Sequence, residues 1–215
     1  MCFNISIVNS KDTIEKQLDA EFDIGSSFKP QKHISAFTNP LIPIITSENR
    51  NNIQLCHWGL IPKWIKNIKK ANEIRKMTYN AKSETINEKP SFRDSINDKK
   101  CLIIADGFYE WQSTSSGKIC HYIKPTKNTI FAFAGIWSEW VNQSTGELVN
   151  STSILTQPAN TMMAKIHNIK KRQPVILEGN HQNDWLKSNQ NYDPILEDAH
   201  NISLASKIIK SPLKG

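Results

Sequence analysis

The sequence has 215 residues, of which 38% are hydrophobic and 22% are charged, and its formal net charge is +7. This composition excludes collagen-like and strongly disordered chains, and the length suits one domain with a continuous core. No apolar run approaches the roughly 20 residues that cross a bilayer, and acidic residues such as Asp12 and Glu15 replace the apolar part of a signal peptide. We therefore expect a cytoplasmic protein without a membrane partner.

Strands and short helices alternate in the first half of the chain. The expected elements are a strand at Cys2–Val8, a helix at Lys11–Ala20 capped by Ser10, strands at Ile42–Thr46 and Ile53–Leu60, and two short helices within Ser83–Asn97, separated by Pro90, the second at Ser91–Ile96.

Strands dominate the second half. The expected elements are a strand at Cys101–Trp111 interrupted by Asp106-Gly107, a hairpin of His121–Lys124 and Ile130–Val141, strands at Ser151–Thr156 and Pro174–Leu177, and helices at Asn160–Ile166 and Asn183–Lys187. Strands follow one another without long crossover helices. The predicted class is α+β: a single domain over residues 1–215, with a mainly antiparallel or mixed, barrel-like sheet and peripheral helices.

The four cysteines form no C-x-x-C pair, and they are Cys2, Cys56, Cys101 and Cys120. We expect reduced thiols, because no secretory signal accompanies them. Cys56-His57 is an isolated pair, so a metal site is not expected. Glycine-rich nucleotide motifs are also absent, and we expect no cofactor.

Basic residues suggest a polyanionic partner. The sequence pI is near 9.2, and basic residues cluster in Lys63–Lys70, at Lys99-Lys100 and at Lys170-Lys171-Arg172. Trp58 and Trp64 lie near the first cluster, and rings beside phosphate-binding cations are typical of single-strand binding. The same pattern also fits a solvated helix face with tryptophans in the core.

The second residue carries unusual chemistry if the initiator methionine is removed. Cys2 then presents an α-amine and a thiol on neighbouring carbons. The amine can form an imine with an aldehyde, and the thiol can close on the imine carbon to give a thiazolidine ring. The thiol could instead attack a carbonyl, as in N-terminal-nucleophile hydrolases. The remaining alternative is an apolar residue at a frayed terminus.

Three further residues could assist Cys2. Glu110 lies among aromatic residues at the end of an apolar strand, where desolvation raises a carboxyl pKa, although it could equally pair with a lysine. His167 precedes a basic triplet and could lie near a phosphate, or be a structural histidine. Asn80 could orient the amine or a sugar hydroxyl, or cap a helix.

Several motifs in order resemble the SRAP family, the SOS response-associated peptidase-like proteins, over about residues 2–180. They are Met1-Cys2, Trp58-Gly59-Leu60-Ile61-Pro62-x-Trp64, Asn80-Ala81-Lys82-Ser83-Glu84-Thr85, Ala105-Asp106-Gly107-Phe108-Tyr109-Glu110-Trp111 and His167. The resemblance implies a mainly β fold and a positively charged groove that leads single-stranded DNA to the N-terminal cysteine.

The resemblance also implies roles for individual residues. Cys2 would remove Met1 autocatalytically and crosslink the ring-opened sugar of an abasic site. Asn80 would position Cys2 and the sugar, Glu110 would be the general acid and base, and His167 would assist ring opening and crosslink reversal.

The sequence departs from the family pattern in three places. Phe3-Asn4 replaces the usual Gly-Arg after the cysteine, so an arginine expected to contact DNA is missing. Lys82 replaces an arginine, which keeps the charge but loses bidentate geometry. Four residues separate His167 from Arg172, where the family usually has one.

The leading hypothesis is covalent capture of abasic sites in single-stranded DNA by a monomer that associates with the nucleoid when bound to DNA. The residues expected to contact DNA are Trp58, Trp64, Lys82, Lys170 and Arg172. One alternative is a cysteine peptidase or amidohydrolase that acts in trans. Another is a non-catalytic single-strand binding module, whose affinity would fall steeply as salt rises.

Overall fold

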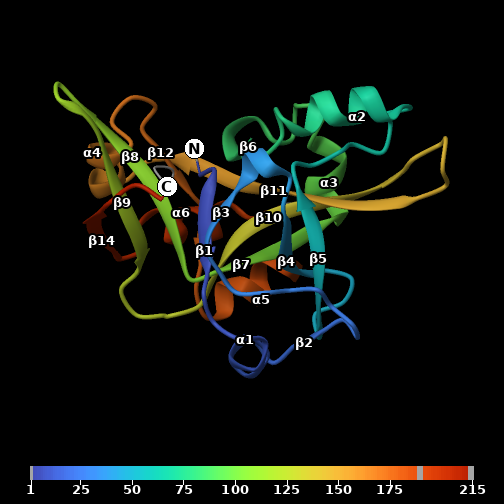
Figure 1. The fold of residues 1–215 in the computed structure, drawn as a ribbon, viewed down its shortest axis with the longest axis horizontal. Coiled ribbons are helices and arrows are strands. Elements are labelled where there is room, and N and C mark those ends of the chain that lie inside the picture. The colour runs from blue at the N-terminus through green and yellow to red at the C-terminus, as the bar shows by residue number, and fades with distance from the viewer. Residues whose placement is uncertain (1, 188–190, 213–215) are drawn as a thin grey trace.

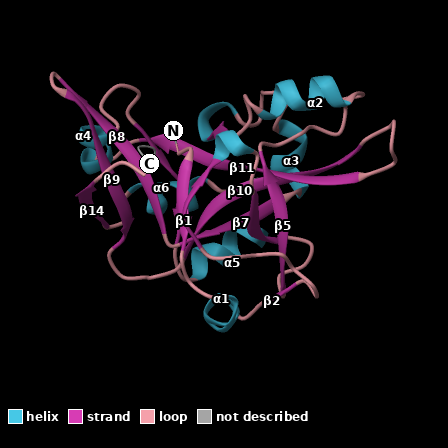
Figure 2. Ribbon diagram, in the orientation of Figure 1, coloured by secondary structure: helices cyan, strands magenta, loops and turns pink. Residues whose placement is uncertain are grey.

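The centre of the fold is a closed barrel (Figures 1 and 2), in a computed structural model that describes residues 2–187 and 191–212. Its strands, in spatial order, are β11 (Leu148–Pro158), β10 (Phe131–Val141), β7 (Lys100–Ala105), β4 (Leu41–Thr46) and β5 (Asn52–Trp58). These neighbours are antiparallel, and the parallel pairing of Ser151 with His57 closes the ring between β11 and β5.

Close packing inside the barrel explains the apolar runs in β7 and β10, most of whose side chains are buried. At Gly135 of β10, an added Cβ would lie 2.7 Å from Ile103 and 2.8 Å from Cys101. Only glycine leaves these side chains their space.

Short strands extend the barrel at its margins. β2 (Glu21–Phe22) runs parallel to β5, β6 (Asn80–Lys82) runs parallel to β11, and β12 (Arg172–Pro174) and β13 (Ile176–Leu177) pair antiparallel with β11 and β10.

A second sheet stands beside the barrel. Its order is β14 (Leu204–Ile209), β9 (Gly117–Pro125), β8 (Gly107–Thr114), β1 (Asn4–Ile7) and β3 (Gln31–Ser35). The chain crosses from β7 into β8 at Asp106, whose carboxylate accepts hydrogen bonds from Ser6 Oγ at 2.6 Å and Asn9 Nδ2 at 3.0 Å. The expected break at Asp106-Gly107 is therefore the point where the chain changes sheets.

Helices lie around the outside (Figure 2). They are α1 (Lys11–Leu18), α2 (Ile68–Arg75), α3 (Arg93–Asp98), α4 (Thr161–Ile166), α5 (Asn180–Lys187) and α6 (Asp193–His200), with 3-10 turns at Ala36–Thr38 and Ser83–Thr85. α5 covers the barrel with Trp185, whose ring is buried. Its indole nitrogen donates to the backbone oxygens of Cys101 at 3.1 Å and Gly135 at 3.2 Å.

The expected α+β class with a barrel-like mixed sheet and peripheral helices is confirmed. The expected hairpin of His121–Lys124 with Ile130–Val141 is wrong: β9 pairs with β8 and β14, whereas β10 belongs to the barrel. No helix among the described residues is long and apolar enough to cross a membrane.

Candidate functional site

Cys2 lies directly before β1 and is 0% exposed. Its Sγ is 3.9 Å from the backbone oxygen of Asn4. Burial, and after it the charge of Glu110, raises the pKa of the Cys2 thiol well above its ordinary value. A base must therefore take the thiol proton when the sulfur attacks a carbon atom.

Asn80 ties this N-terminal segment to the barrel. It begins β6, opposite Ile154 of β11, and its Nδ2 donates a 2.9 Å hydrogen bond to the backbone oxygen of Cys2. The Oδ1 atom of the same amide is buried and has no hydrogen-bond partner among the described residues. The amide thus holds Cys2 with its nitrogen, whereas the acceptor capacity of its oxygen is unused among the described residues.

Glu110 is a buried carboxyl whose charge acts on the Cys2 thiol. It lies in β8, opposite His121 of β9, and is 5% exposed. Burial raises the pKa of the Glu110 carboxyl to about 7. At neutral pH the protonated and ionised forms are both well populated, which suits a group that both takes and gives a proton.

His167 ends α4, where its backbone nitrogen donates to the Met163 oxygen at 2.7 Å. Its Nδ1 lies 3.1 Å from the backbone nitrogen and 3.0 Å from the backbone oxygen of Arg172, so the Arg172 main chain can bind this nitrogen in either tautomer. Burial lowers the pKa of the His167 imidazole, which favours its neutral form at neutral pH.

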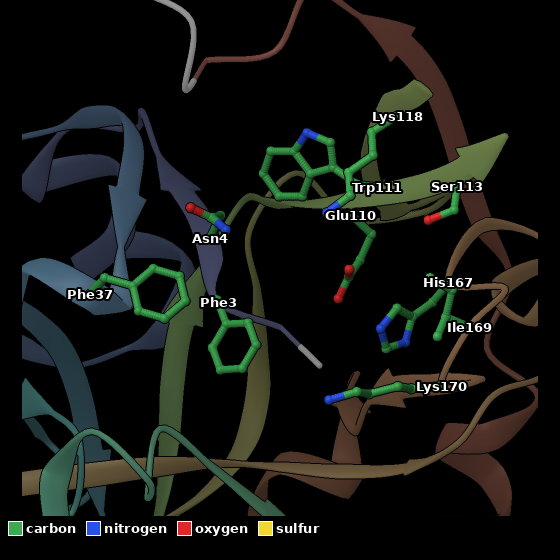
Figure 3. Close-up of a pocket in the computed structure, with 10 residues that line it drawn as sticks. All are labelled: Phe3, Asn4, Phe37, Glu110, Trp111, Ser113, Lys118, His167, Ile169 and Lys170. Atoms are coloured by element: carbon green, nitrogen blue, oxygen red, sulfur yellow. The ribbon is translucent and has the colours of Figure 1, made fainter. Parts of the chain in front are cut away.

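Glu110 and His167 face the same pocket, whose volume is about 350 Å³ (Figure 3). Figure 3 shows their side chains directed into one space, with Phe3 and Phe37 on its other side. The full lining is Phe3, Asn4, Phe37, Glu110, Trp111, Ser113, Lys118, His167, Ile169 and Lys170.

A second pocket, of about 620 Å³, shares Phe3 with the first and is lined by Asn80 and Lys82 among others. The Phe3 ring packs against Phe37 and Tyr79, at centroid distances of 5.1 and 6.1 Å. Two pockets with different polar groups therefore meet at the residue that follows Cys2.

Two of the residues expected to contact DNA are buried. Trp58 is 0% exposed, and its indole donates to the Tyr79 backbone oxygen at 2.9 Å, so the ring cannot stack on a base. Arg172 is buried, and its guanidinium binds both carboxylate oxygens of Glu84 and the backbone oxygen of Thr156. These contacts stabilise β12 and leave the arginine unsuited to bind a phosphate.

The other three expected contacts are accessible. Trp64 is 51% exposed, and its indole donates to the backbone oxygen of Pro90, a residue of the second pocket, at 3.2 Å. Lys82 and Lys170 are exposed and line the second and first pockets.

Sequence reasoning missed Phe37 and Lys118 as lining residues. They come from segments far apart in the chain, and no local pattern links them to Cys2. Phe3 was noted only as a departure from the family pattern, although its position beside Cys2 was a usable signal. Among residues 2–187 and 191–212, no three histidine, cysteine, aspartate or glutamate side chains gather as metal ligands would.

Comparisons with known proteins agree with the resemblance drawn from the motifs. Residues 1–210 match the family described as SOS response associated peptidase (SRAP). The "Abasic site processing protein YoaM" of Bacillus subtilis (strain 168) is 36% identical over 188 residues, which cover 86% of this chain and 79% of that protein. The "Abasic site processing protein HMCES" of Xenopus tropicalis is 32% identical over 140 residues, covering 57% of this chain and 41% of that protein.

A crystal structure of a protein from Bacteroides thetaiotaomicron has the same fold. The TM-score is 0.89 at 33% identity, and the alignment covers 98% of this chain and 93% of that one.

Proposed function

Because this chain belongs to the SOS response associated peptidase family, we propose that it processes abasic sites in DNA by capturing the lesion covalently with Cys2. The observation that carries the proposal is the gathering of Asn80 and Glu110 around Cys2, at a pocket that His167 also faces. The lesion is an aldehyde in its ring-opened form, and Cys2 offers the two nucleophiles that an aldehyde needs to form a stable ring.

The reaction begins with removal of Met1, by Cys2 itself or by an aminopeptidase. The freed α-amine attacks the sugar aldehyde carbon, and loss of one water gives an imine. The Cys2 sulfur then adds to the imine carbon while its proton passes, by way of Glu110, to the imine nitrogen. The product is a thiazolidine, and one water is released overall.

Glu110 moves the protons in this scheme. Its acid form protonates the departing hydroxyl, and its ionised form accepts the proton of the buried Cys2 thiol. His167 assists opening of the sugar ring, since a mostly neutral imidazole can exchange a proton with the sugar hydroxyl. Asn80 holds the Cys2 backbone during both additions.

The DNA is single-stranded in this proposal. Trp64 offers an exposed ring to a base, and Lys82 and Lys170 offer charges to phosphates on either side of Phe3. In this proposal the protein acts as a monomer in the cytoplasm. It needs no metal or organic cofactor, because imine and thiazolidine formation need only an amine, a thiol and proton transfer.

Intact-protein mass spectrometry tests the proposal. The protein is mixed with single-stranded DNA that carries one abasic site, beside undamaged DNA and a Cys2→Ala variant. The expected product is a protein without Met1 that gains one DNA strand minus one water, only with intact Cys2 and only on damaged DNA. A Cys2→Ser variant should give an adduct only after borohydride reduction, which traps the imine.

Two other outcomes would redirect the proposal. Turnover of unrelated peptides without any adduct would favour a hydrolase that acts in trans. Salt-sensitive binding of undamaged single strands, unchanged in Cys2→Ser and without any adduct, would favour a plain binding module.

A further inference from the structure

We propose that Gln112 and Asn168 form a clamp that positions His167 across the pocket from Glu110. The inference rests on the proposed role of His167 and adds two residues that no motif pointed to. Both act through His167, so they are positioning residues.

The clamp consists of three hydrogen bonds between β8 and the end of α4. Gln112 Nε2 donates to the backbone oxygen of Lys165 at 3.1 Å. Asn168 Nδ2 donates to the backbone oxygen of Ser113 at 2.8 Å, and Asn168 Oδ1 accepts from the Ser113 backbone nitrogen at 3.1 Å. The two residues held in this way, at positions 165 and 168, lie on either side of His167.

The strand that receives these bonds also carries Glu110, two residues before Gln112. The contacts between β8 and the end of α4 therefore help to set the separation of His167 and Glu110. β1 pairs with β8 at Gly107 and Phe108, so within the described part of the chain no strand pairs with Ser113 on that side. The Asn168 amide, with one donor and one acceptor, binds there as a strand residue would.

The loop from residue 168 to residue 171 is also tied at its far end, where the Lys171 nitrogen donates to the His167 oxygen at 2.8 Å and the Ala159 nitrogen donates to the Lys171 oxygen at 2.9 Å. α4 has only six residues, too few to be stable by itself. Ile169 is 71% exposed, and Lys171 adopts a positive φ of 47°. The amide bonds from β8 therefore act together with the Arg172 main chain, which contacts His167 Nδ1, in setting where the loop and His167 lie.

A hydrogen bond to β9 also orients the Gln112 side chain. Its Oε1 lies 3.3 Å from Nε2 of His121, whose Nδ1 lies 2.8 Å from Ser206 Oγ in β14. A continuous set of hydrogen bonds thus runs from the outer strand of the second sheet to the end of α4.

The test is a mutant cycle on the capture reaction with single-stranded DNA that carries an abasic site. Asn168→Ala and Gln112→Ala should each lower the crosslinking rate constant at saturating DNA, by roughly 10- to 100-fold, because displaced catalytic groups cost this much. The DNA concentration at half-saturation should stay the same. Asn168→Asp keeps the acceptor for Ser113 and should lose less.

The cycle partner is His167→Ala. If Asn168 acts through His167, the double variant is no slower than His167→Ala alone. Asn97→Ala is the matched control, because Asn97 is exposed on α3 and its amide nitrogen donates to the Arg93 backbone oxygen of the same helix at 3.1 Å. Two results would overturn the clamp. One is a double variant whose rate constant falls by the product of the two single losses, and the other is a change in the DNA concentration at half-saturation without a change in the rate constant.

A DNA-free measurement separates the clamp from the capture reaction. The imidazole resonances of His167 in NMR spectra should shift or broaden in Asn168→Ala and stay unchanged in Asn97→Ala. Absence of any adduct in the wild-type protein would refute capture, yet this comparison would still decide the clamp. Unchanged His167 resonances in Asn168→Ala would refute the clamp.

Discussion

Glu110 is the residue whose environment differs most from that of an ordinary glutamate. A carboxyl that is 5% exposed cannot be solvated as an ion by bulk water, and burial raises its pKa to about 7. The same burial keeps the Cys2 thiol protonated. A weakly acidic thiol and a carboxylate of raised basicity are suited to exchange a proton at the moment of attack.

The pH dependence of capture should therefore follow Glu110. We expect the plot of log rate constant against pH to change slope near pH 7 in the wild-type protein. Glu110→Gln should be slower by about 10²- to 10⁴-fold, as expected for loss of a general acid–base group. Single-turnover crosslinking between pH 5 and pH 9 measures both. A slope change that survives in Glu110→Gln would assign it to another group.

Glu110 should also reduce stability at neutral pH. Its pKa is raised on folding, from about 4.3 in an unfolded chain, so its contribution is most favourable below pH 4 and is lost as pH rises towards 7. The loss corresponds to about 3 kcal/mol. Denaturant unfolding should show Glu110→Gln becoming more stable than wild type by about this amount between pH 4 and pH 8, whereas equal stability at pH 8 would contradict the burial argument.

Two tryptophans show what a local pattern can and cannot predict. Trp58 and Trp64 lie in the same motif, and sequence alone assigned both to DNA. The structure buries Trp58 completely and leaves Trp64 51% exposed. Exposure depends on the pairing of β5 with β11 across the barrel, which is a tertiary contact that the motif does not encode.

Substitution should separate these two rings. Trp58→Phe should lower the free energy of unfolding by about 1–3 kcal/mol, through the lost bond to Tyr79 and the lost volume, with DNA affinity unchanged. Trp64→Ala should weaken binding of undamaged single strands by about 1–3 kcal/mol, with little effect on stability. Denaturant unfolding and fluorescence anisotropy measure the two effects, and the reverse assignment would contradict this reading.

Among the elements, those with a local signal were predictable. The Ser10 side chain caps α1 as expected, and its Oγ accepts from the Thr13 nitrogen at 3.3 Å. The expected strand at Pro174–Leu177 is instead two short strands, because Val175 bonds with Leu155 and Ala134 between them. α2, α6 and β14 were missed, because these elements are short and tertiary contacts stabilise them. α6 carried a usable signal, since Pro194 stands in its first turn and the buried residues Ile195 and Ala199 are four apart.

β12 shows how an element can hold a site residue. Its Arg172 binds Glu84 through both carboxylate oxygens, and its main chain contacts the His167 ring. Burial by itself would raise the pKa of Glu84, but the hydrogen bonds from Arg172 and its charge outweigh burial and lower it. The ion pair thus connects the turn at Ser83–Thr85 with the loop after α4.

Removing the Glu84 charge should loosen this connection. Glu84→Gln should destabilise the fold by about 1 kcal/mol at pH 7, a modest value because the Glu84 side chain is 42% exposed and the pair is partly screened. A carboxyl whose pKa is lowered on folding stabilises the folded state at pH values above its unfolded pKa. This stabilisation is lost as the pH falls through the folded pKa. In denaturant unfolding the difference should therefore begin to shrink as the pH falls below the unfolded pKa of about 4.3 and should vanish once Glu84 is protonated in the folded state, whereas a constant difference would point to a cause other than charge.

At the scale of the whole molecule, charge gathers where the pockets meet. Lys82 and Lys170 line the two pockets that share Phe3, and Lys118 also lines the first. α1, which also carries lysines, lies at the end of the molecule opposite the N-terminus in Figure 1 and therefore far from these pockets. The net charge of +7 alone would not distinguish these regions.

Salt titration tests which cations meet the phosphates. For single strands, each phosphate-bound cation contributes about 0.7 to the slope of log affinity against log salt. Lys82→Gln and Lys170→Gln should each reduce the slope by about this amount in anisotropy measurements on undamaged DNA. Lys16→Gln on α1 is the control, and Arg172→Lys should also leave the slope unchanged, because the Arg172 guanidinium is bound to Glu84. A slope reduced as much by Arg172→Lys as by Lys170→Gln would mean that DNA opens the ion pair and that Arg172 binds phosphate after all.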